Sequence, residues 1–491
     1  MEPGEIFKDV LRVVDPGQPV FLVGGAVRDR ILGREIHDYD FTLSGDTRAA
    51  ARKIADQHEG AFYPLDEERG TYRVILTGPR REQYALDFAV MRADSLDADL
   101  RGRDFTINAM AVDLAHPEQV IDPLGGERDL QERILRACAA TSIKDDPVRA
   151  LRAVRLEMTL DLKVDSATET QIRKSPGWLE RISQERVRDE LFRILDLGRG
   201  DEGLQRLEKY GLFSVILPDL GGLKGLRQSP PHIYPGWEHT LEVVRRLDQV
   251  WSLLVSAEVP PTHMDEFLAQ AHAVLGRFHE PLVNHYGRLL VPLRNIHGLV
   301  VFSALYHDSA KPITSTTDPN GRIRFFNHDE RGARIAARRA RILTLSSAEI
   351  ERIDTVISGH MRVHQLVDTA QNPSLRAIYR YFRATHEAGI DICFLSLADT
   401  LGTYGETLPM EHWLRVLRTV ELLLEAYFHQ PEKTVSPPRL ITGDDLLREF
   451  GLKPGPVIGR ILEAVREAQV AGEVKNRSEA ISLADQIRNE V

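Results

Sequence analysis

Short apolar runs alternate with helical patterns along the first quarter of the chain, and helical patterns alone follow. Apolar runs of strand length lie at Val20–Val23, Tyr72–Leu76 and Leu86–Met91, with amphipathic stretches between them. Later, apolar positions recur at helical spacing, as in Val148–Leu160 and Ser183–Leu197. The pattern predicts a compact α/β head followed by an all-α remainder.

Breaks rich in proline and glycine divide this pattern into four expected domains. One such passage spans Leu217–Gly236, and a second runs from Gln430 to Pro438. A chain of 491 residues is long enough to bury several cores. The expected domains are a head over 1–137, a helical neck over 138–222, a histidine-rich helical domain over 223–428 and a small helical tail over 429–491.

Composition narrows the class of protein. The net charge of -10 speaks against a protein that coats nucleic acid indiscriminately, so any nucleic-acid surface must be local. The best candidate is one helix face with arginines three and four residues apart, at Arg331, Arg334, Arg338 and Arg341. We find no apolar run of transmembrane length and no signal pattern at the start, so we expect a cytoplasmic protein with no membrane partner.

A glycine turn followed by paired acids is the strongest chemical signal. Gly24 and Gly25 follow a strand and open a helix, so the backbone and its amides can approach a triphosphate, to which Arg28 adds donors. Asp38 and Asp40 lie two apart in an expected strand, His37–Thr42, and therefore share a face. Both can hold the same pair of Mg²⁺ ions, which lower the pKa of an attacking 3′-hydroxyl and neutralise pyrophosphate. The pattern indicates nucleotidyl transfer.

Other polar residues fit a third carboxylate and sugar recognition. Asp87 lies on a neighbouring expected strand, where it is either the acid that orients the metals or takes the hydroxyl proton, or an ordinary strand-edge acid. The segment RGRDFTINAM combines a phosphate-seeking guanidinium with an acid and an amide at helical spacing. These candidate nucleotide-binding residues are Arg103, Asp104 and Asn108.

The segment DDPVR opens an expected helix and offers a way to read a base. Asp146 and Arg149 lie three apart, so both can face one planar ligand. The carboxylate accepts from an exocyclic amine and the guanidinium donates to ring acceptors, which selects C and A over U and G. Arg152 and Arg155 extend this face toward the triphosphate or the primer end. Acids at a helix start are alternatively caps.

Taken in order, these motifs resemble class II tRNA nucleotidyltransferases, the family of CCA-adding enzymes and bacterial poly(A) polymerases. The matching motifs are GGAVRD with its two acids, RGRDFTINAM, DPLGGERDL, DDPVR and SQER. The resemblance implies a polymerase-beta-type head, CTP and ATP as donors, tRNA as acceptor, and an Asp146–Arg149 amino-acid template. The chain departs from the family pattern at Asp145, where glutamate is usual, and at Gly102, which interrupts an arginine pair.

The length of one segment bears on which nucleotides a member of this family adds. Only ten residues, Ala93–Gly102, separate Arg92 from Arg103. Family members that complete CCA carry a longer flexible loop there, and members that lack it add only the two cytidines and leave the terminal A to a separate A-adding enzyme. The resemblance therefore favours a CC-adding enzyme. A full CCA-adding enzyme and a poly(A) polymerase remain alternatives.

The histidine-rich domain resembles the HD superfamily of metal-dependent phosphohydrolases. The resemblance implies a divalent transition metal or Mg²⁺ held by His239, His307, Asp308 and Asp399. His328 and His360 are left for a second metal, for substrate phosphate or for an ordinary core position. A further alternative follows, in which the head is a scaffold and this domain is the enzyme, acting on RNA ends.

Overall fold

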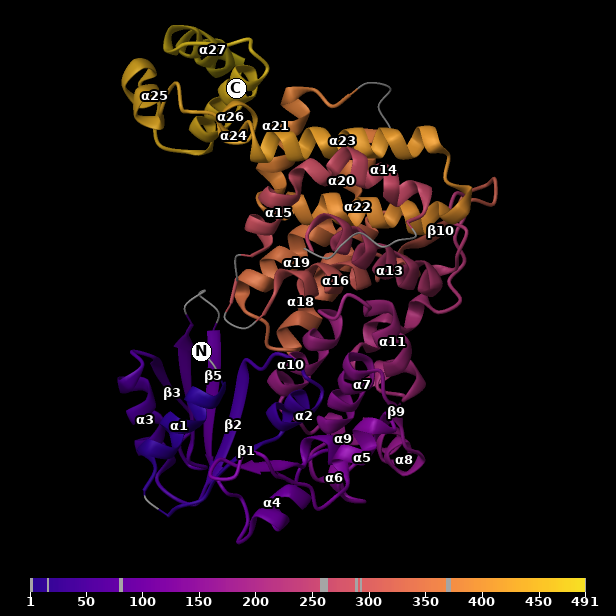
Figure 1. The fold of residues 1–491 in the computed structure, drawn as a ribbon. Coiled ribbons are helices and arrows are strands. Elements are labelled where there is room, and N and C mark those ends of the chain that lie inside the picture. The colour runs from indigo at the N-terminus through magenta and orange to yellow at the C-terminus, as the bar shows by residue number, and fades with distance from the viewer. Residues whose placement is uncertain are drawn as a thin grey trace. The chain divides into compact units, whose positions relative to one another are not determined.

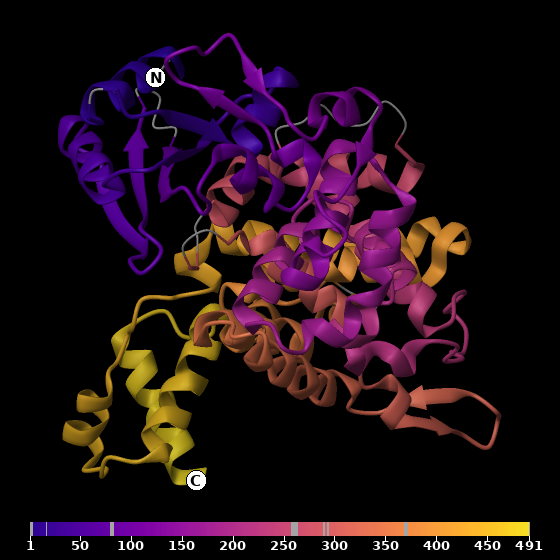
Figure 2. The ribbon, with the colours of Figure 1, turned by 90° about the horizontal axis from the view of Figure 1, so that it is seen from below.

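The computed structural model describes residues 3–15, 17–78, 83–256, 264–287, 290–291, 294–367 and 372–490. The chain forms two compact units. The first contains residues 1–183 and 206–215, and the second contains residues 184–205 and 216–491. Figures 1 and 2 follow the chain through both units. No helix of the described part is both long and apolar enough to cross a membrane.

A mixed sheet forms the centre of the first unit (Figure 1). Within the described residues it has seven strands in the order β3-β4-β5-β2-β1-β6-β7. β1 pairs antiparallel with β2, and β2 pairs parallel with β5. The strands are β1 Val20–Val23, β2 Asp38–Leu43, β3 Ala61–Asp66, β4 Thr71–Thr77, β5 Gln83–Val90, β6 Ala111–Asp113 and β7 Val120–Ile121.

Alternating side chains in β2 decide which face of this sheet is core. Tyr39 and Phe41 are buried, and both rings meet Phe7 edge to face, with ring centroids 6.2 and 6.5 Å apart. Phe7 belongs to α1 (Pro3–Val13), which packs on α3 (Thr47–Gln57). Because side chains alternate along a strand, Asp38 and Asp40 lie on the opposite face of β2.

The rest of the first unit is mostly helical. The elements near the candidate site are α2 Gly25–Ile31, α4 Leu96–Arg101, the 3₁₀ turn η1 Thr106–Asn108, α5 Gly126–Gln131, α6 Ser142–Asp145 and α7 Arg149–Leu160. The helix expected to open within DDPVR begins only at Arg149. Asp146 is extended, with φ −144° and ψ 91°, because Pro147 disfavours helical backbone in the residue before it.

The second unit is built around a buried helix, α22 (Ala388–Tyr404), whose residues are buried from Ala388 to Thr403. α13 and α19 pack against it, and α16 packs on both of these helices. The surrounding helices include α10 Gln184–Leu195, α13 Gly236–Leu254, α16 Ile296–Tyr306, α18 His328–Ile342, α19 Ser347–Gly359, α20 Met361–Val367, α21 Leu375–Thr385 and α23 Met410–Phe428. The predicted α/β head followed by a helical remainder is confirmed.

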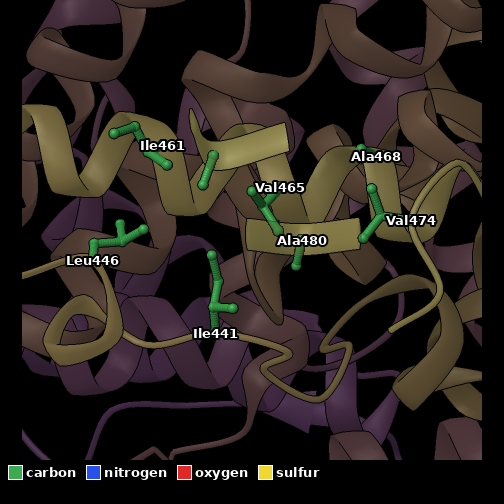
Figure 3. Close-up of a cluster of buried hydrophobic side chains, with 8 residues drawn as sticks. Ile441, Leu446, Ile461, Val465, Ala468, Val474 and Ala480 are labelled. Atoms are coloured by element: carbon green, nitrogen blue, oxygen red, sulfur yellow. The ribbon is translucent and has the colours of Figure 1, made fainter. Parts of the chain in front are cut away.

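The last segment of the second unit has a small core of its own. Its helices are α25 Gly443–Phe450, α26 Pro456–Val470 and α27 Arg477–Glu490. Figure 3 shows side chains from all three helices and from the preceding segment meeting in one cluster, which includes Ile441, Leu446 and Ile461. From here on, the tail means residues 440–490, which is shorter than the tail domain expected over 429–491.

Candidate functional site

The two acids of β2 lie beside the glycine turn. The strand register pairs Asp40 with Val23, the last residue of β1, so Asp40 adjoins Gly24. A Cβ atom on Gly24 would lie 3.2 Å from Asp40 Oδ2, and Gly24 has a φ of 75°. Only glycine accepts both constraints without strain. Asp38 and Asp40 thus share one face next to a bend that leaves room for close approach of a ligand.

The surroundings of Asp40 favour a bound cation. Burial, helped by the neighbouring charge of Asp87, raises the pKa of Asp40 to about 6. Asp38 adds to this rise, whereas the Arg103 guanidinium opposes it. Carboxylates crowded together repel each other, and a divalent cation relieves that repulsion. Their oxygen donors suit Mg²⁺.

Asp87 is brought to the same place by the sheet. β5 lies beside β2 with Asp87 in register with Asp40. Both Asp87 oxygens accept from Arg73, whose Nε and Nη2 each lie 2.7 Å away. Asp87 therefore has the position expected of a third carboxylate, held in a bidentate ion pair.

The predicted phosphate and ribose residues form one chain of hydrogen bonds. Arg28 Nη1 donates to Asn108 Oδ1 over 2.6 Å, and Asn108 Nδ2 donates to Asp104 Oδ1 over 3.1 Å. Arg152 Nη1 donates to Asp104 Oδ2 over 2.9 Å. Burial opposes ionisation of Asp104, but the charge and hydrogen bond of Arg152 outweigh it and lower the pKa. With the N–H of Phe105 also donating, Asp104 keeps about one acceptor position for a ribose hydroxyl.

The short segment 93–102 contains the helix α4, Leu96–Arg101, which side-chain hydrogen bonds hold in place. Ser95 caps α4 by accepting from the Ala98 N–H. Asp99 Oδ1 accepts from the Arg92 N–H over 3.0 Å, and Asp99 Oδ2 accepts from Arg103 Nη2 over 3.1 Å. The Asp99 side chain is 2% exposed. Sequence reasoning missed Asp99, whose only signal is its place four residues before Arg103.

The candidate base-reading pair lies against this segment. Arg149 Nη1 donates to Ser142 Oγ over 2.8 Å, and Arg149 Nη2 donates to the Gly102 carbonyl over 2.9 Å. The Arg149 Nε atom lies 3.8 Å from Asp146 Oδ2. The two residues are therefore brought together as expected from their spacing. Arg152 and Arg155 follow on α7, both partly exposed.

A second cluster lies in the second unit, on helices that Figure 1 shows around α22. His239 Nε2 lies 3.4 Å from Asp308 Oδ2 and 3.3 Å from Asp399 Oδ1. His307 Nε2 lies 3.2 Å from Asp308 Oδ2, and its Nδ1 pairs with the Ala304 carbonyl over 2.7 Å. All four residues are buried. Both ring nitrogens of His239 and the Nε2 of His307 make no hydrogen bond within the described residues, which fits nitrogen and oxygen donors facing a metal.

His328 and His360 join the same cluster. Each ring pairs its Nδ1 with a backbone carbonyl, His328 with Phe325 and His360 with Ile357. The two Nε2 atoms lie 3.2 Å apart, and His328 Nε2 lies 3.4 Å from Asp308 Oδ1. Burial, helped by the charge of His328, lowers the pKa of His360 to about 3, so that ring is neutral at pH 7 and able to act as a ligand.

Three further polar residues surround this cluster. Lys311 Nζ lies 2.6 Å from Asp308 Oδ2 and 3.3 Å from His232 Nε2. His364 Nε2 lies 3.0 Å from Asp399 Oδ2. Sequence reasoning singled out neither His232 nor His364. His364 lies four residues after His360, a usable signal, whereas His232 precedes α13 and reaches the cluster only through the fold.

The arginines predicted for a nucleic-acid surface are exposed on α18. Arg338 pairs with Asp219 over 2.9 Å, and Arg334 lies 3.4 Å from Glu330. Arg331 and Arg341 make no ion pair with a described residue. The four side chains are therefore exposed along one helix, and two of them are paired with an acid.

Comparison with known proteins identifies the family. Residues 20–136 match the "Poly A polymerase head domain", residues 161–222 the "Probable RNA and SrmB- binding site of polymerase A", and residues 423–484 a putative "tRNA nucleotidyltransferase domain 2". The chain is 32% identical to an A-adding tRNA nucleotidyltransferase of Deinococcus radiodurans, covering 94% of this chain and 93% of that protein. It is also 32% identical to a CC-adding tRNA nucleotidyltransferase of Thermus thermophilus, covering 94% and 92%.

A solved structure shares the fold over the same length. The CCA-adding enzyme of Bacillus stearothermophilus in complex with CTP superimposes with a TM-score of 0.61 at 21% identity, covering 100% of this chain and 99% of that one. The resemblance noted in the sequence motifs is thereby confirmed. With relatives above 30% identity along nearly its whole length, the chain belongs to the class II tRNA nucleotidyltransferase family.

Proposed function

We propose that this protein adds cytidine nucleotides to the 3′ end of tRNA, with CTP as the donor. The observation that carries the proposal is the position of Asp38 and Asp40, on one face of β2 and against the Gly24 turn. The full-length relatives named as tRNA nucleotidyltransferases supply the choice of tRNA as acceptor. We place this reaction in the cytoplasm.

The head residues have separate roles in this proposal. Mg²⁺ ions held by Asp38 and Asp40 would supply activation of the 3′-hydroxyl and neutralisation of the leaving pyrophosphate. The amides after Gly24, at the start of α2, and the Arg28 guanidinium bind the triphosphate. Asn108 fixes the direction of that guanidinium. Asp87, held by Arg73, serves as the third carboxylate.

Protein side chains select the base. In this proposal, Asp146 accepts from the exocyclic amine of cytosine and Arg149 donates to its ring acceptors. Arg149 is anchored to the Gly102 carbonyl, so its direction depends on the segment 93–102. Arg103 and Asp104 hold the phosphate and ribose, and Arg152 and Arg155 lie toward the primer end.

The CC-adding subtype is supported by the same segment. Asp99 ties α4 to the backbone of Arg92 and to the guanidinium of Arg103. A segment so short and so fixed has little freedom to reshape the base pocket from CTP to ATP. Sequence similarity alone does not decide the subtype, because the A-adding and the CC-adding relative are both 32% identical to this chain. We therefore assign the terminal A to a separate enzyme.

Nucleotide addition resolved to single residues tests this proposal. A tRNA lacking its 3′ end is incubated with CTP, with ATP or with both, and a tRNA ending in CC is incubated with ATP. We expect two additions with CTP and no further growth when ATP is supplied. A third addition would establish full CCA synthesis, addition only to the CC-ended tRNA would establish an A-adding enzyme, and an ATP ladder on arbitrary RNA would establish a poly(A) polymerase.

The buried histidine cluster favours a second function, phosphoester hydrolysis of the HD type. A divalent transition metal or Mg²⁺ bound by His239, His307, Asp308 and Asp399 would supply a Lewis acid. The ring nitrogens without hydrogen-bond partners in the described residues fit that group. His328 and His360 would bind a second metal or, with Lys311, the substrate phosphate.

Hydrolysis assays separate this activity from nucleotide addition. Protein loaded with Mn²⁺, Ni²⁺ or Mg²⁺ is given a 2′,3′-cyclic nucleotide or p-nitrophenyl phosphate. We expect hydrolysis that Asp308→Asn abolishes and Asp40→Asn preserves. If Asp40→Asn left nucleotide addition unchanged, the head would be a scaffold. No hydrolysis with any of these metals would reject the second function.

A further inference from the structure

The second unit contains a cavity of about 590 Å³ that neither proposed activity uses. Its lining comes from α21, from α23, from the segment before the tail and from α26 of the tail. The residues that matter here are Phe382, Arg383, His386, Tyr427, Arg439 and Arg466. This volume is typical of sites that bind small ligands, which occupy roughly 300–1,000 Å³.

The cavity is positive although the whole chain carries a net charge of -10. Arg383 Nε lies 3.3 Å and Arg466 Nη1 4.0 Å from the same carboxylate oxygen, Oε2 of Glu463. Arg439 is exposed and makes no ion pair with a described residue. Glu387 is the one acid among the described lining residues. Three guanidinia against the two carboxylates of Glu387 and Glu463 leave an excess of positive charge, with Arg439 the least compensated, and this suits a phosphate group.

Aromatic rings line the same cavity. The ring centroids of Phe382 and Tyr427 lie 5.2 Å apart with planes tilted by 35°. Tyr379 closes the wall and donates its hydroxyl to Glu463 Oε1 over 3.0 Å. Tyr379 and Phe382 are buried and Tyr427 is partly exposed, so Tyr427 is the ring on which a nucleobase can stack while guanidinia hold its phosphate.

The backbone at the rim is strained. His386, just after α21, has φ 48° and ψ −137°, a region that residues other than glycine adopt only at a cost. Its side chain lines the cavity. The imidazole is exposed and is therefore placed to contact a ligand in the cavity.

The cavity lies where the tail meets α21 through charged contacts. Arg376 Nη2 lies 2.7 Å from Glu473 Oε2, and Arg380 Nε donates to Glu467 Oε1 over 2.8 Å. The apolar cluster of the tail (Figure 3) includes none of the residues that make these charged contacts. A phosphate bound by Arg383, on α21, and by Arg466, on α26, would connect α21 with the tail.

We propose that this cavity binds one phosphorylated nucleoside unit. Arg383, Arg439 and Arg466 hold the phosphate, and the base stacks on Tyr427 beside His386. The unit comes either from a stretch of RNA or from a free nucleotide, since both present the same chemistry. The inference rests on the proposed function only in taking tRNA as the RNA to be tested.

Equilibrium binding to the full-length protein distinguishes the two sources. The variant is Arg439→Glu, and the matched control is Arg48→Glu, which makes the same charge change at an exposed arginine of α3. One arm measures fluorescence anisotropy of a tRNA lacking its 3′ end over a range of salt concentrations. The other measures the stoichiometry of CMP and AMP binding by equilibrium dialysis.

If the unit belongs to RNA, Arg439→Glu weakens tRNA binding about tenfold and lowers the slope of log K against log salt by about one. If it is a free nucleotide, Arg439→Glu removes one bound CMP or AMP per chain. Arg439→Lys, which keeps the charge, should retain most of the binding. Arg439→Glu behaving like Arg48→Glu in both arms overturns the proposal.

These outcomes are independent of the polymerising activity. Binding is measured without nucleotide addition, so a protein that adds no cytidine can still bind through this cavity. Conversely, Arg439→Glu should add cytidines at the wild-type rate when tRNA is saturating. Thermal unfolding of the variant within about 2 °C of the wild type excludes a folding defect, because substitutions at exposed positions usually change stability little.

Discussion

The candidate metal ligands of the head and of the helical unit are assembled differently. In the head, Asp38 and Asp40 lie two residues apart on one strand, and the neighbouring strand adds Asp87 in register. In the helical unit, the ligands come from α13, the end of α16 and α22, which are far apart in sequence (Figure 1). The head cluster is partly open to solvent, whereas the helical cluster is buried.

This difference has chemical consequences. The head offers carboxylate oxygens only, which suit a hard and readily exchanged ion such as Mg²⁺. The helical cluster offers imidazoles as well, held in direction by hydrogen bonds to backbone carbonyls. Such oriented nitrogens suit a tightly held transition metal. A substitution in one cluster should therefore leave the function of the other cluster intact.

The largest expected effect is on nucleotide addition. Asp40→Asn should lower the single-turnover rate of cytidine addition by roughly a thousandfold or more, as losses of transition-state charge stabilisation do. Asp113→Asn, on β6 of the same sheet, should leave the rate near wild type. Asp308→Asn should also leave it near wild type, and a parallel loss of addition in Asp308→Asn would show that the two clusters do not act separately.

A smaller effect is expected on metal affinity in the helical unit. His364 pairs with Asp399 over 3.0 Å and so positions a ligand. His364→Ala should weaken metal binding about 10- to 100-fold, measured by chelator competition and elemental analysis. His429→Ala removes a partly exposed histidine of the same unit and should change nothing. Equal affinity in His364→Ala and wild type would argue against a metal at Asp399.

The two clusters also differ in how well the sequence predicts them, because their residues lie at different distances along the chain. Asp38 and Asp40 could be predicted to share a face because a strand repeats every two residues. The chain from Arg28 through Asn108 to Asp104 could not be predicted, because it joins segments that only the tertiary fold brings together. The strand Val20–Val23 was predicted with the observed bounds.

The histidine cluster of the helical unit could be predicted from the sequence for a different reason. His307 and Asp308 are adjacent in sequence, and a familiar order of motifs pointed to their partners, but nothing in the periodicity placed His232 beside Lys311. The bend at Asp146 was missed, although Pro147 carries the local signal for it. Sequence reasoning thus located residues within elements better than contacts between elements.

Within the first unit, base selection should separate from metal binding. Asp146→Ala should reduce discrimination between CTP and UTP by about 1–3 kcal/mol, or roughly 5- to 150-fold, measured as the ratio of kcat/KM values. Asp145→Ala is the matched control, because Asp145 is exposed and accepts from Thr141 Oγ1. Unchanged discrimination in Asp146→Ala would remove Asp146 from the proposed template.

The smallest expected effect concerns a buried histidine that is not a metal candidate. His297 Nε2 lies 3.0 Å from Asp248 Oδ1, and His297 Nδ1 lies 3.7 Å from Asp196 Oδ1. Both ring nitrogens thus face a carboxylate. In His239, by contrast, Nε2 lies near the carboxylates of Asp308 and Asp399, and Nδ1 has no hydrogen-bond partner in the described residues. The contrast separates a structural histidine from a candidate ligand within one helical unit.

Burial alone would lower the pKa of His297, but the neighbouring carboxylates of Asp196 and Asp248 raise it to about 9. The folded pKa exceeds the unfolded value of about 6.5, so protonation stabilises the fold fully below pH 6.5, and this contribution is lost as pH rises through 9. Denaturant unfolding followed through Trp251, whose ring centroid lies 4.6 Å from that of His297, should show a loss on the order of 1 kcal/mol. His297→Gln should flatten this dependence. His429→Gln is the control, because the His429 side chain is 42% exposed and its pair with Glu425 is screened by solvent. An equal slope in all three proteins would contradict the charged network.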